Sequence, residues 1–193
     1  MSIRAVLAVS SVALAAPGVA LADFDYDFVE FSLVDVEIDD TSIDGDGYRF
    51  EGAFEMGESF LIHAEYEDYD FDFNINGNVF EIGGGYFHPM SEDLDFIATG
   101  QFVQIEIGSG DDDGIGIGGG VRTRLSDTFE VDAMLNWVDL DQIGSDSYLD
   151  LRGRFYFNPE FAATLKFEVG SDVFDTMALG VRYNFGSTGG PAE

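Results

Sequence analysis

The two histidines are the first residues to test for chemistry, because an enzyme in this chain would draw its general base from them. His63 shares its parity with Glu65 in a segment of alternating polar and apolar residues, and His88 precedes Pro89 in a short turn. General-base catalysis needs a nucleophile within hydrogen-bond reach of the imidazole, and nothing in the pattern places a serine beside either histidine. We therefore predict that the chain is not an enzyme and that His63 contributes to structural polar packing.

An acidic segment over residues 39–47 is the second candidate site, in this case for calcium. Positions 1, 3, 5, 6 and 12 of the calcium-loop pattern are occupied by Asp40, Ser42, Asp44, Gly45 and Glu51. The flanking residues have the pattern of strands rather than helices, and Gly47 stands where an apolar residue is usual. The pattern leaves two interpretations, loosely bound calcium at Asp40, Asp44 and Asp46 or an acidic turn in water, and it indicates no other cofactor.

The cations form a third pattern, because all of those beyond residue 4 occupy one parity of alternating segments. They are Arg49, Arg122, Arg124, Arg152, Arg154, Lys166 and Arg182. Successive side chains of a strand point to opposite faces. The cations therefore share one face with carboxylates of the same parity, among them Glu51, Glu65, Glu81 and Asp150. Buried charges are tolerated when they are paired, so we expect these residues to form an interior charge network.

The alternation predicts ten strands, with eight as the smaller alternative, and hence an all-β, transmembrane, up-and-down antiparallel barrel. The predicted strands span residues 24–36, 48–56, 59–67, 78–88, 94–107, 114–125, 128–139, 148–157, 161–169 and 174–185. Short turns alternate with longer acidic connections at 37–47, 68–77, 108–113, 140–147 and 170–173. Outer-membrane barrels combine short periplasmic turns with longer extracellular loops, so we expect the acidic segments to be loops.

The polarity of the two faces distinguishes a membrane barrel from a soluble one, because a soluble lipid carrier would turn the apolar face inward. Aromatic residues of the apolar face gather beside the short turns, at Phe54, Phe60, Tyr86, Phe129, Phe155, Phe157, Phe161, Tyr183 and Phe185. Such a girdle is expected at a membrane interface. Glycines of the polar face, such as Gly83 and those in 114–120, either make room inside a narrow barrel or bend the strands.

The N-terminal residues indicate export from the cytoplasm. Arg4, the apolar run 5–16 and the A-x-A site at 20–22 have the order of a cleaved secretory signal. We divide the chain into a signal peptide at 1–22, a barrel at 23–185 and a short tail at 186–193. The formal net charge of −30 makes nucleic acid a poor partner. The chain has no cysteine, so packing, ladder hydrogen bonds or the membrane must stabilise it.

The signal, the alternation and the final strand together resemble the small outer-membrane β-barrels of Gram-negative type, of the OmpA/OmpX-like or porin-like class. The last strand carries the most specific likeness, because Phe185 matches the terminal aromatic residue of the family, with Tyr183 and Val181 at alternating positions before it. The resemblance implies an outer-membrane location and recognition of these residues by the outer-membrane assembly machinery. The chain departs from the family in continuing to Glu193 and in having ten strands rather than eight.

The expected function is a structural or surface role with at most a narrow, cation-preferring pore, because about eight strands leave room only for side chains. Outer-membrane lipid and lipopolysaccharide are the expected surroundings, and we expect a monomer. Two alternatives stay open. One is a surface adhesin or ion-dependent binding module that acts through the acidic loops, and the other is a soluble periplasmic lipid-binding barrel.

Overall fold

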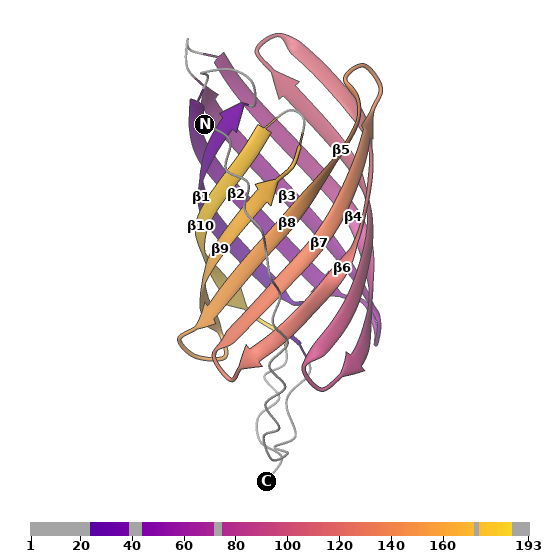
Figure 1. Ribbon diagram of the computed structural model, residues 1–193, viewed down its shortest axis with the longest axis vertical. Coiled ribbons are helices and arrows are strands. Elements are labelled where there is room, and N and C mark those ends of the chain that lie inside the picture. Colours follow the sequence, from indigo (N-terminus) through magenta and orange to yellow (C-terminus); the bar gives the residue numbers. More distant parts are fainter. Residues whose placement is uncertain (1–23, 39–43, 72–74, 172–173, 187–193) are drawn as a thin grey trace.

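The chain forms one closed antiparallel β-barrel of ten strands (Figure 1). The computed structural model describes residues 24–38, 44–71, 75–171 and 174–186. Its strands are β1 (Phe28–Ile38), β2 (Asp44–Glu55), β3 (Phe60–Phe71), β4 (Ile75–Ser91), β5 (Leu94–Ile107), β6 (Gly110–Ser126), β7 (Phe129–Leu140), β8 (Gly144–Tyr156), β9 (Phe161–Val169) and β10 (Phe174–Asn184). Each strand pairs with its neighbours in sequence, so the predicted ten-stranded, up-and-down topology is confirmed. The described part of the chain contains no helix with the length and apolar character needed to span a bilayer.

The pairing of β1 with β10 closes the barrel. Its ladder runs from Phe28 opposite Asn184 to Ile38 opposite Phe174. One further backbone hydrogen bond, from the Phe185 N–H to the Asp27 carbonyl at 2.9 Å, extends it beyond the strands. Closure removes every sheet edge, so each strand has partners on both sides. The predicted signal peptide at 1–22 and most of the predicted tail at 186–193 lie outside the described residues.

The barrel has two ends, which differ in their side chains more than in their connections. The end where β1 begins and β10 ends, here called the terminal end, has connections at 56–59, 92–93, 127–128 and 157–160. The opposite end, here called the acidic end, has connections at 39–43, 72–74, 108–109, 141–143 and 170–173. The predicted asymmetry of short turns and long loops is therefore wrong. Most of the residues that we assigned to acidic loops are strand, because the ladders continue almost to the turns.

The acidic segments can form strands because the two faces of the sheet exchange their chemistry along the barrel. Side chains still alternate between inward and outward positions, but at the acidic end the outward ones are carboxylates and the inward ones are apolar. Near the middle of β1, Leu33 points outward and is 65% exposed, whereas Ser32 points inward and is buried. Two residues later, Val34 is buried inside and Asp35 is exposed outside. The same reversal occurs on most of the other strands. The outward carboxylates beyond this point form an acidic collar of Asp35, Glu37, Asp44, Asp46, Asp70, Glu106, Asp111, Asp113 and Asp139.

The inner face at the acidic end is correspondingly apolar. A cluster of buried side chains covers much of it, made of Val34, Val36, Tyr69, Phe71, Val79, Val103, Leu140 and Ala178. Between the collar and the terminal end, the outer wall is a belt of exposed apolar residues that includes all nine aromatic residues of the predicted girdle. The barrel therefore has a membrane-type wall over most of its height and a water-type wall at the acidic end.

Glycines of the inner face allow neighbouring strands to approach closely. A Cβ added to Gly114 on β6 would lie 2.0 Å from the backbone oxygen of Asp139 on β7, far inside van der Waals contact. Gly100 on β5 faces outward, and a Cβ added there would meet nothing within 4 Å. The inward glycine at 114 is thus required by strand proximity rather than by backbone torsion.

We expect Gly114→Ala to destabilise the barrel by about 1–3 kcal/mol, because the added methyl must push two paired strands apart. The measurement is urea unfolding of the refolded protein in lipid vesicles, followed by the mobility shift of unboiled samples. Gly100→Ala is the matched control and should leave the unfolding midpoint unchanged or slightly higher. Equal midpoints for the two variants would contradict the steric role of Gly114.

Candidate functional site

The barrel interior is the candidate functional site, because all seven cations beyond residue 4 point into it. Arg49, Arg122 and Arg182 are each only 1% exposed, although they carry full charges inside the wall. Removing a charged group from water costs several kcal/mol unless partners compensate it. The contacts of these cations therefore show how the interior is organised.

An ion-pair cluster lies toward the terminal end, between β6, β7 and β8. Arg154 contacts both carboxylate oxygens of Asp132 through two hydrogen bonds of 2.6 Å each, in the bidentate geometry that gives the strongest pairs. Arg122 donates to Glu130 at 2.7 and 3.0 Å. Arg124 contacts the other oxygen of Glu130 at 3.3 Å. Because the register places Arg122 opposite Asp132 and Arg124 opposite Glu130, the ladder itself brings these charges together.

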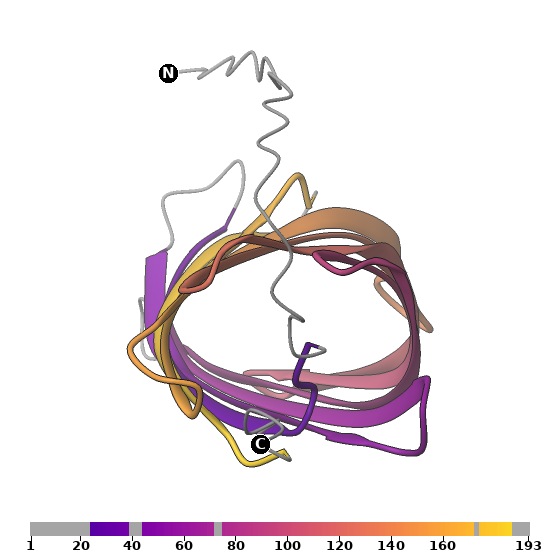
Figure 2. The same ribbon diagram turned by 90° about the horizontal axis from the view of Figure 1, so that it is seen from below.

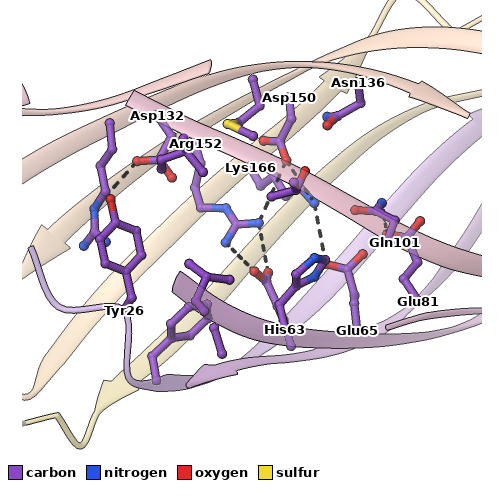
Figure 3. A pocket seen from close by; sticks show the side chains of 18 of the residues that line it. Tyr26, His63, Glu65, Glu81, Gln101, Asp132, Asn136, Asp150, Arg152 and Lys166 are labelled. Atoms are coloured by element: carbon purple, nitrogen blue, oxygen red, sulfur yellow. Dashed lines mark hydrogen bonds and ion pairs between the residues drawn. The ribbon is translucent and has the colours of Figure 1, made fainter. Parts of the chain in front are cut away.

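A second cluster crosses the middle of the barrel and joins strands that are far apart in sequence. Arg152 on β8 pairs with Glu51 on β2 at 2.9 Å. Lys166 on β9 pairs with Glu168 at 2.5 Å and with Asp150 on β8 at 3.2 Å. Figure 3 shows Lys166 and Glu65 reaching toward each other across the cavity, with Nζ and a carboxylate oxygen 3.7 Å apart. Such contacts bridge opposite walls and fill the lumen.

Arg49 marks the boundary between the charged middle and the apolar acidic end. It contacts Glu67, Glu168 at 3.1 Å and Glu65 at 3.5 Å. Glu67 also accepts a hydrogen bond from the hydroxyl of Tyr69.

Glu81 lies beside this group and accepts a hydrogen bond of 2.5 Å from the amide of Gln101. Within the described residues, no Lys or Arg nitrogen lies within 4 Å of the Glu81 carboxylate.

The residues just before β1 close the terminal end from inside. Figure 2 shows this indigo segment bending away from the wall into the barrel opening. The hydroxyl of Tyr26 donates to Asp95 at 2.8 Å, and its ring stacks on Phe87 at 4.4 Å. The carbonyl of Asp25 accepts hydrogen bonds from Arg122 at 3.0 Å and Arg182 at 2.8 Å. We call residues 24–27 the N-terminal plug.

The plug corrects the prediction of a strand over 24–36, because β1 begins only at Phe28. Phe24 and Tyr26 share the parity of the inward residue Glu30, so a strand would have placed two aromatic rings on a polar face. That mismatch was the available signal. The rings instead stack beneath guanidinium groups, with Arg122 lying 4.8 Å from the centre of the Phe24 ring and 4.9 Å from that of Tyr26.

Two neighbouring cavities lie between these groups. The larger has a volume of about 150 Å³ and lies in the charged middle, where His63, Gln101 and Asn136 line it with the ion pairs (Figure 3). The smaller has a volume of about 90 Å³ and lies at the acidic end. Four residues line both cavities and form the partition between them, namely Glu65, Glu81, Tyr148 and Glu168. Sequence reasoning did not identify Tyr148 or Gln101, because neither carries a charge.

The proposed calcium residues are not brought together with Glu51. Asp44 and Asp46 are exposed on β2, whereas Glu51 points inward and pairs with Arg152. Residues 44–51 belong to β2, so this part of the predicted calcium loop is strand. Asp40 lies outside the described residues. Within the described ranges, no group of three or more histidine or carboxylate side chains could hold a metal ion, so calcium stays a prediction.

The residues of the expected assembly signal lie on the outer wall at the terminal end. Val181, Tyr183 and Phe185 are 56%, 40% and 45% exposed. The ring of Tyr183 packs against that of Phe161 at 5.0 Å, so it belongs to the aromatic girdle. His88 points outward near the end of β4, where its ring stacks on Tyr86 at 6.3 Å.

Solved structures with the same fold are transmembrane β-barrels. The beta domain of the Bordetella autotransporter Brka matches with a TM-score of 0.52 and 10% identity, covering 82% of this chain and 99% of that chain. The translocator domain of the autotransporter NalP from Neisseria meningitidis matches with a TM-score of 0.50 and 12% identity, covering 86% and 91%. At these identities the likeness shows the fold alone. No protein-family model and no curated protein matches the chain.

The bidentate pair of Arg154 and Asp132 should be among the most sensitive interior contacts. We expect Arg154→Met to lower the free energy of unfolding by about 3–5 kcal/mol, because it leaves the buried Asp132 carboxylate with reduced compensation. The double variant Arg154→Met/Asp132→Leu should recover part of that loss, since it removes both charges. Urea unfolding in vesicles measures both losses, together with that of the single variant Asp132→Leu, which completes the cycle. A double variant that loses the sum of the two single losses would contradict direct coupling.

Proposed function

We propose that the chain is a small outer-membrane β-barrel protein with a structural or surface role and a narrow pathway that favours cations. The observation that most strongly supports this proposal is the polarity of the barrel wall. Large apolar side chains such as Leu135 at 64% exposure cover the outer belt, while the arginines are buried inside. In water, that belt would expose far more contiguous apolar surface than soluble proteins tolerate. Hydrocarbon is the solvent in which both faces are satisfied.

The acidic collar and the aromatic girdle indicate the orientation in the membrane. The girdle residues lie at the terminal end, where rings with an apolar body suit the lipid interface. The collar lies beyond the belt at the other end, and its carboxylates require water. We therefore place the terminal end at the periplasm and the acidic end outside the cell. This orientation also supports Val181, Tyr183 and Phe185 as the residues presented to the assembly machinery.

The interior of this pathway favours small cations over anions. Around the partition, the five carboxylates of Glu65, Glu67, Glu81, Asp150 and Glu168 face three cations, Arg49, Lys166 and, 4.0 Å from Asp150, Arg152. An anion entering from the acidic end would meet this surplus after passing the collar. The cavities are also small, and the N-terminal plug occupies the terminal end, so the pathway admits single ions rather than metabolites.

The structure gives different support to the two alternative functions, a soluble lipid-binding barrel and a surface-binding module. A soluble lipid-binding barrel is disfavoured, because its apolar face would have to line the interior, whereas ion pairs line the middle here. A surface-binding role through divalent ions gains one supporting observation. The register places Asp46 directly opposite both Asp35 and Asp70, and like charges in such positions repel unless they are screened. Lipopolysaccharide phosphates bridged by divalent ions would be the matching partner, with the protein as a monomer.

Trp137, the single tryptophan, provides a direct test of the membrane wall. It is 37% exposed on the outer face of β7, two residues before the collar residue Asp139. We expect strong quenching of its fluorescence in vesicles whose acyl chains are brominated near the headgroup, compared with unbrominated vesicles. The control Trp137→Phe/Asn136→Trp moves the indole to the inner face of the same strand and should be quenched much less. Equal fluorescence of the native protein in both lipids would rule out a lipid-facing belt.

The plug should set the conductance. In planar bilayers we expect small cation-selective steps, and we expect Phe24→Ala/Tyr26→Ala to enlarge them several-fold by opening the terminal end. The matched control is Phe157→Ala, which removes an aromatic ring at the same end but from the outer face, where it is 66% exposed. It should leave the step size unchanged. Large anion-selective currents from the native protein would contradict the proposed pathway.

A further inference from the structure

The smaller cavity at the acidic end combines two chemistries that the ion pathway does not require. Its sides are apolar, formed by Val79, Val103, Ile105, Val138 and Leu140. All five point inward from β4, β5 and β7, and three of them belong to the buried apolar cluster. A route for hydrated ions would be expected to carry polar walls throughout. We call this cavity the upper chamber.

The floor of the upper chamber is the carboxylate-rich partition. Glu65, Glu67, Glu81 and Glu168 all line it. Arg49 neutralises part of this charge through Glu67 and Glu168, and Lys166 reaches Glu168 from the side of the larger cavity. Glu81 contributes a carboxylate whose described contact is the neutral amide of Gln101. A half-buried carboxylate without a cation is costly and is neutralised either by a proton or by a cation. A ligand cation in the chamber would take the place of that proton.

We propose that the upper chamber binds a small organic ammonium ion with its alkyl part against the valine and leucine walls and its charged nitrogen at Glu81. The apolar walls give no advantage to a bare metal ion, and the floor repels a carboxylate or phosphate ligand. Size restricts the ligand further. An apolar cavity of roughly 150 Å³ holds benzene, so a chamber of about 90 Å³ suits a short alkyl chain.

Binding of an ammonium ion in the upper chamber requires the closed barrel but does not require ion conduction. Binding could therefore occur in a barrel that passes no current. Conversely, a conducting barrel could leave the chamber empty. Ligand binding and conductance are measured separately for this reason.

The test is isothermal titration of the refolded full-length protein in detergent with n-butylammonium chloride, corrected with empty micelles. Sodium butyrate carries the opposite charge on the same alkyl length, and methylammonium chloride carries the same charge without the apolar part. We expect saturable binding of butylammonium, with both other ions binding at least tenfold more weakly. Butyrate binding as tightly as butylammonium, or no saturable butylammonium binding, would overturn the proposal.

Two variants locate the site. Glu81→Gln should weaken butylammonium binding at least tenfold, whereas Glu106→Gln, the same change on an exposed collar residue, should not alter it. Leu140→Ala enlarges the chamber and should shift the preference toward n-hexylammonium. A heat-modifiable band in gel electrophoresis verifies that each variant has folded. Unchanged affinity in folded Glu81→Gln together with an unchanged chain-length preference in folded Leu140→Ala would exclude the chamber as the binding site.

Discussion

The need to compensate buried charge is the constraint on which the rest of this structure depends. A wall that meets hydrocarbon must send its charged residues inward, and ten strands leave little room there for water. Each interior cation therefore needs acceptors within a few ångströms. The ladder supplies some of them directly, as for Arg122 opposite Asp132. The remaining contacts cross the lumen, as from Arg152 to Glu51. These cross-barrel pairs tie distant strands together, so the feature that fits the wall to a membrane also fills the interior.

The reversal of face chemistry at the acidic end divides the barrel into two solvent regimes. Over the belt, apolar residues meet lipid and charges point inward. Beyond Leu33 on β1, valines pack inside and carboxylates point outward, as they would in a water-soluble barrel. The backbone does not change across this boundary, because side-chain alternation is a property of the strand and not of its surroundings. The upper chamber arises at this boundary, where apolar walls meet the last layer of carboxylates.

The two ends of the interior are closed by different means, and this affects function. At the terminal end, the plug inserts aromatic rings beneath Arg122 and offers the Asp25 carbonyl as an acceptor. At the acidic end, strand side chains themselves narrow the lumen. Between them lies a small polar cavity with a surplus of carboxylates. A structural or surface role, a narrow cation pathway and a site for an organic cation are all compatible with this interior, because each uses the same negative partition.

The sequence by itself determined the strand number, the closed antiparallel topology and the inward position of Arg49, Lys166 and the other cations. It could do so because side chains alternate with a period of two along a strand, whichever strands lie beside it. It did not determine where the strands end. Acidic residues at 68–71 and 110–113 resembled loops, since outward carboxylates are compatible with a strand only beyond the lipid, and depth is a tertiary property. Partners such as Glu51 for Arg152 and the fold of residues 24–27 into the lumen were likewise decided by the tertiary structure. Barrel closure and shear set which side chains face each other across the interior, and no local pattern encodes that distance.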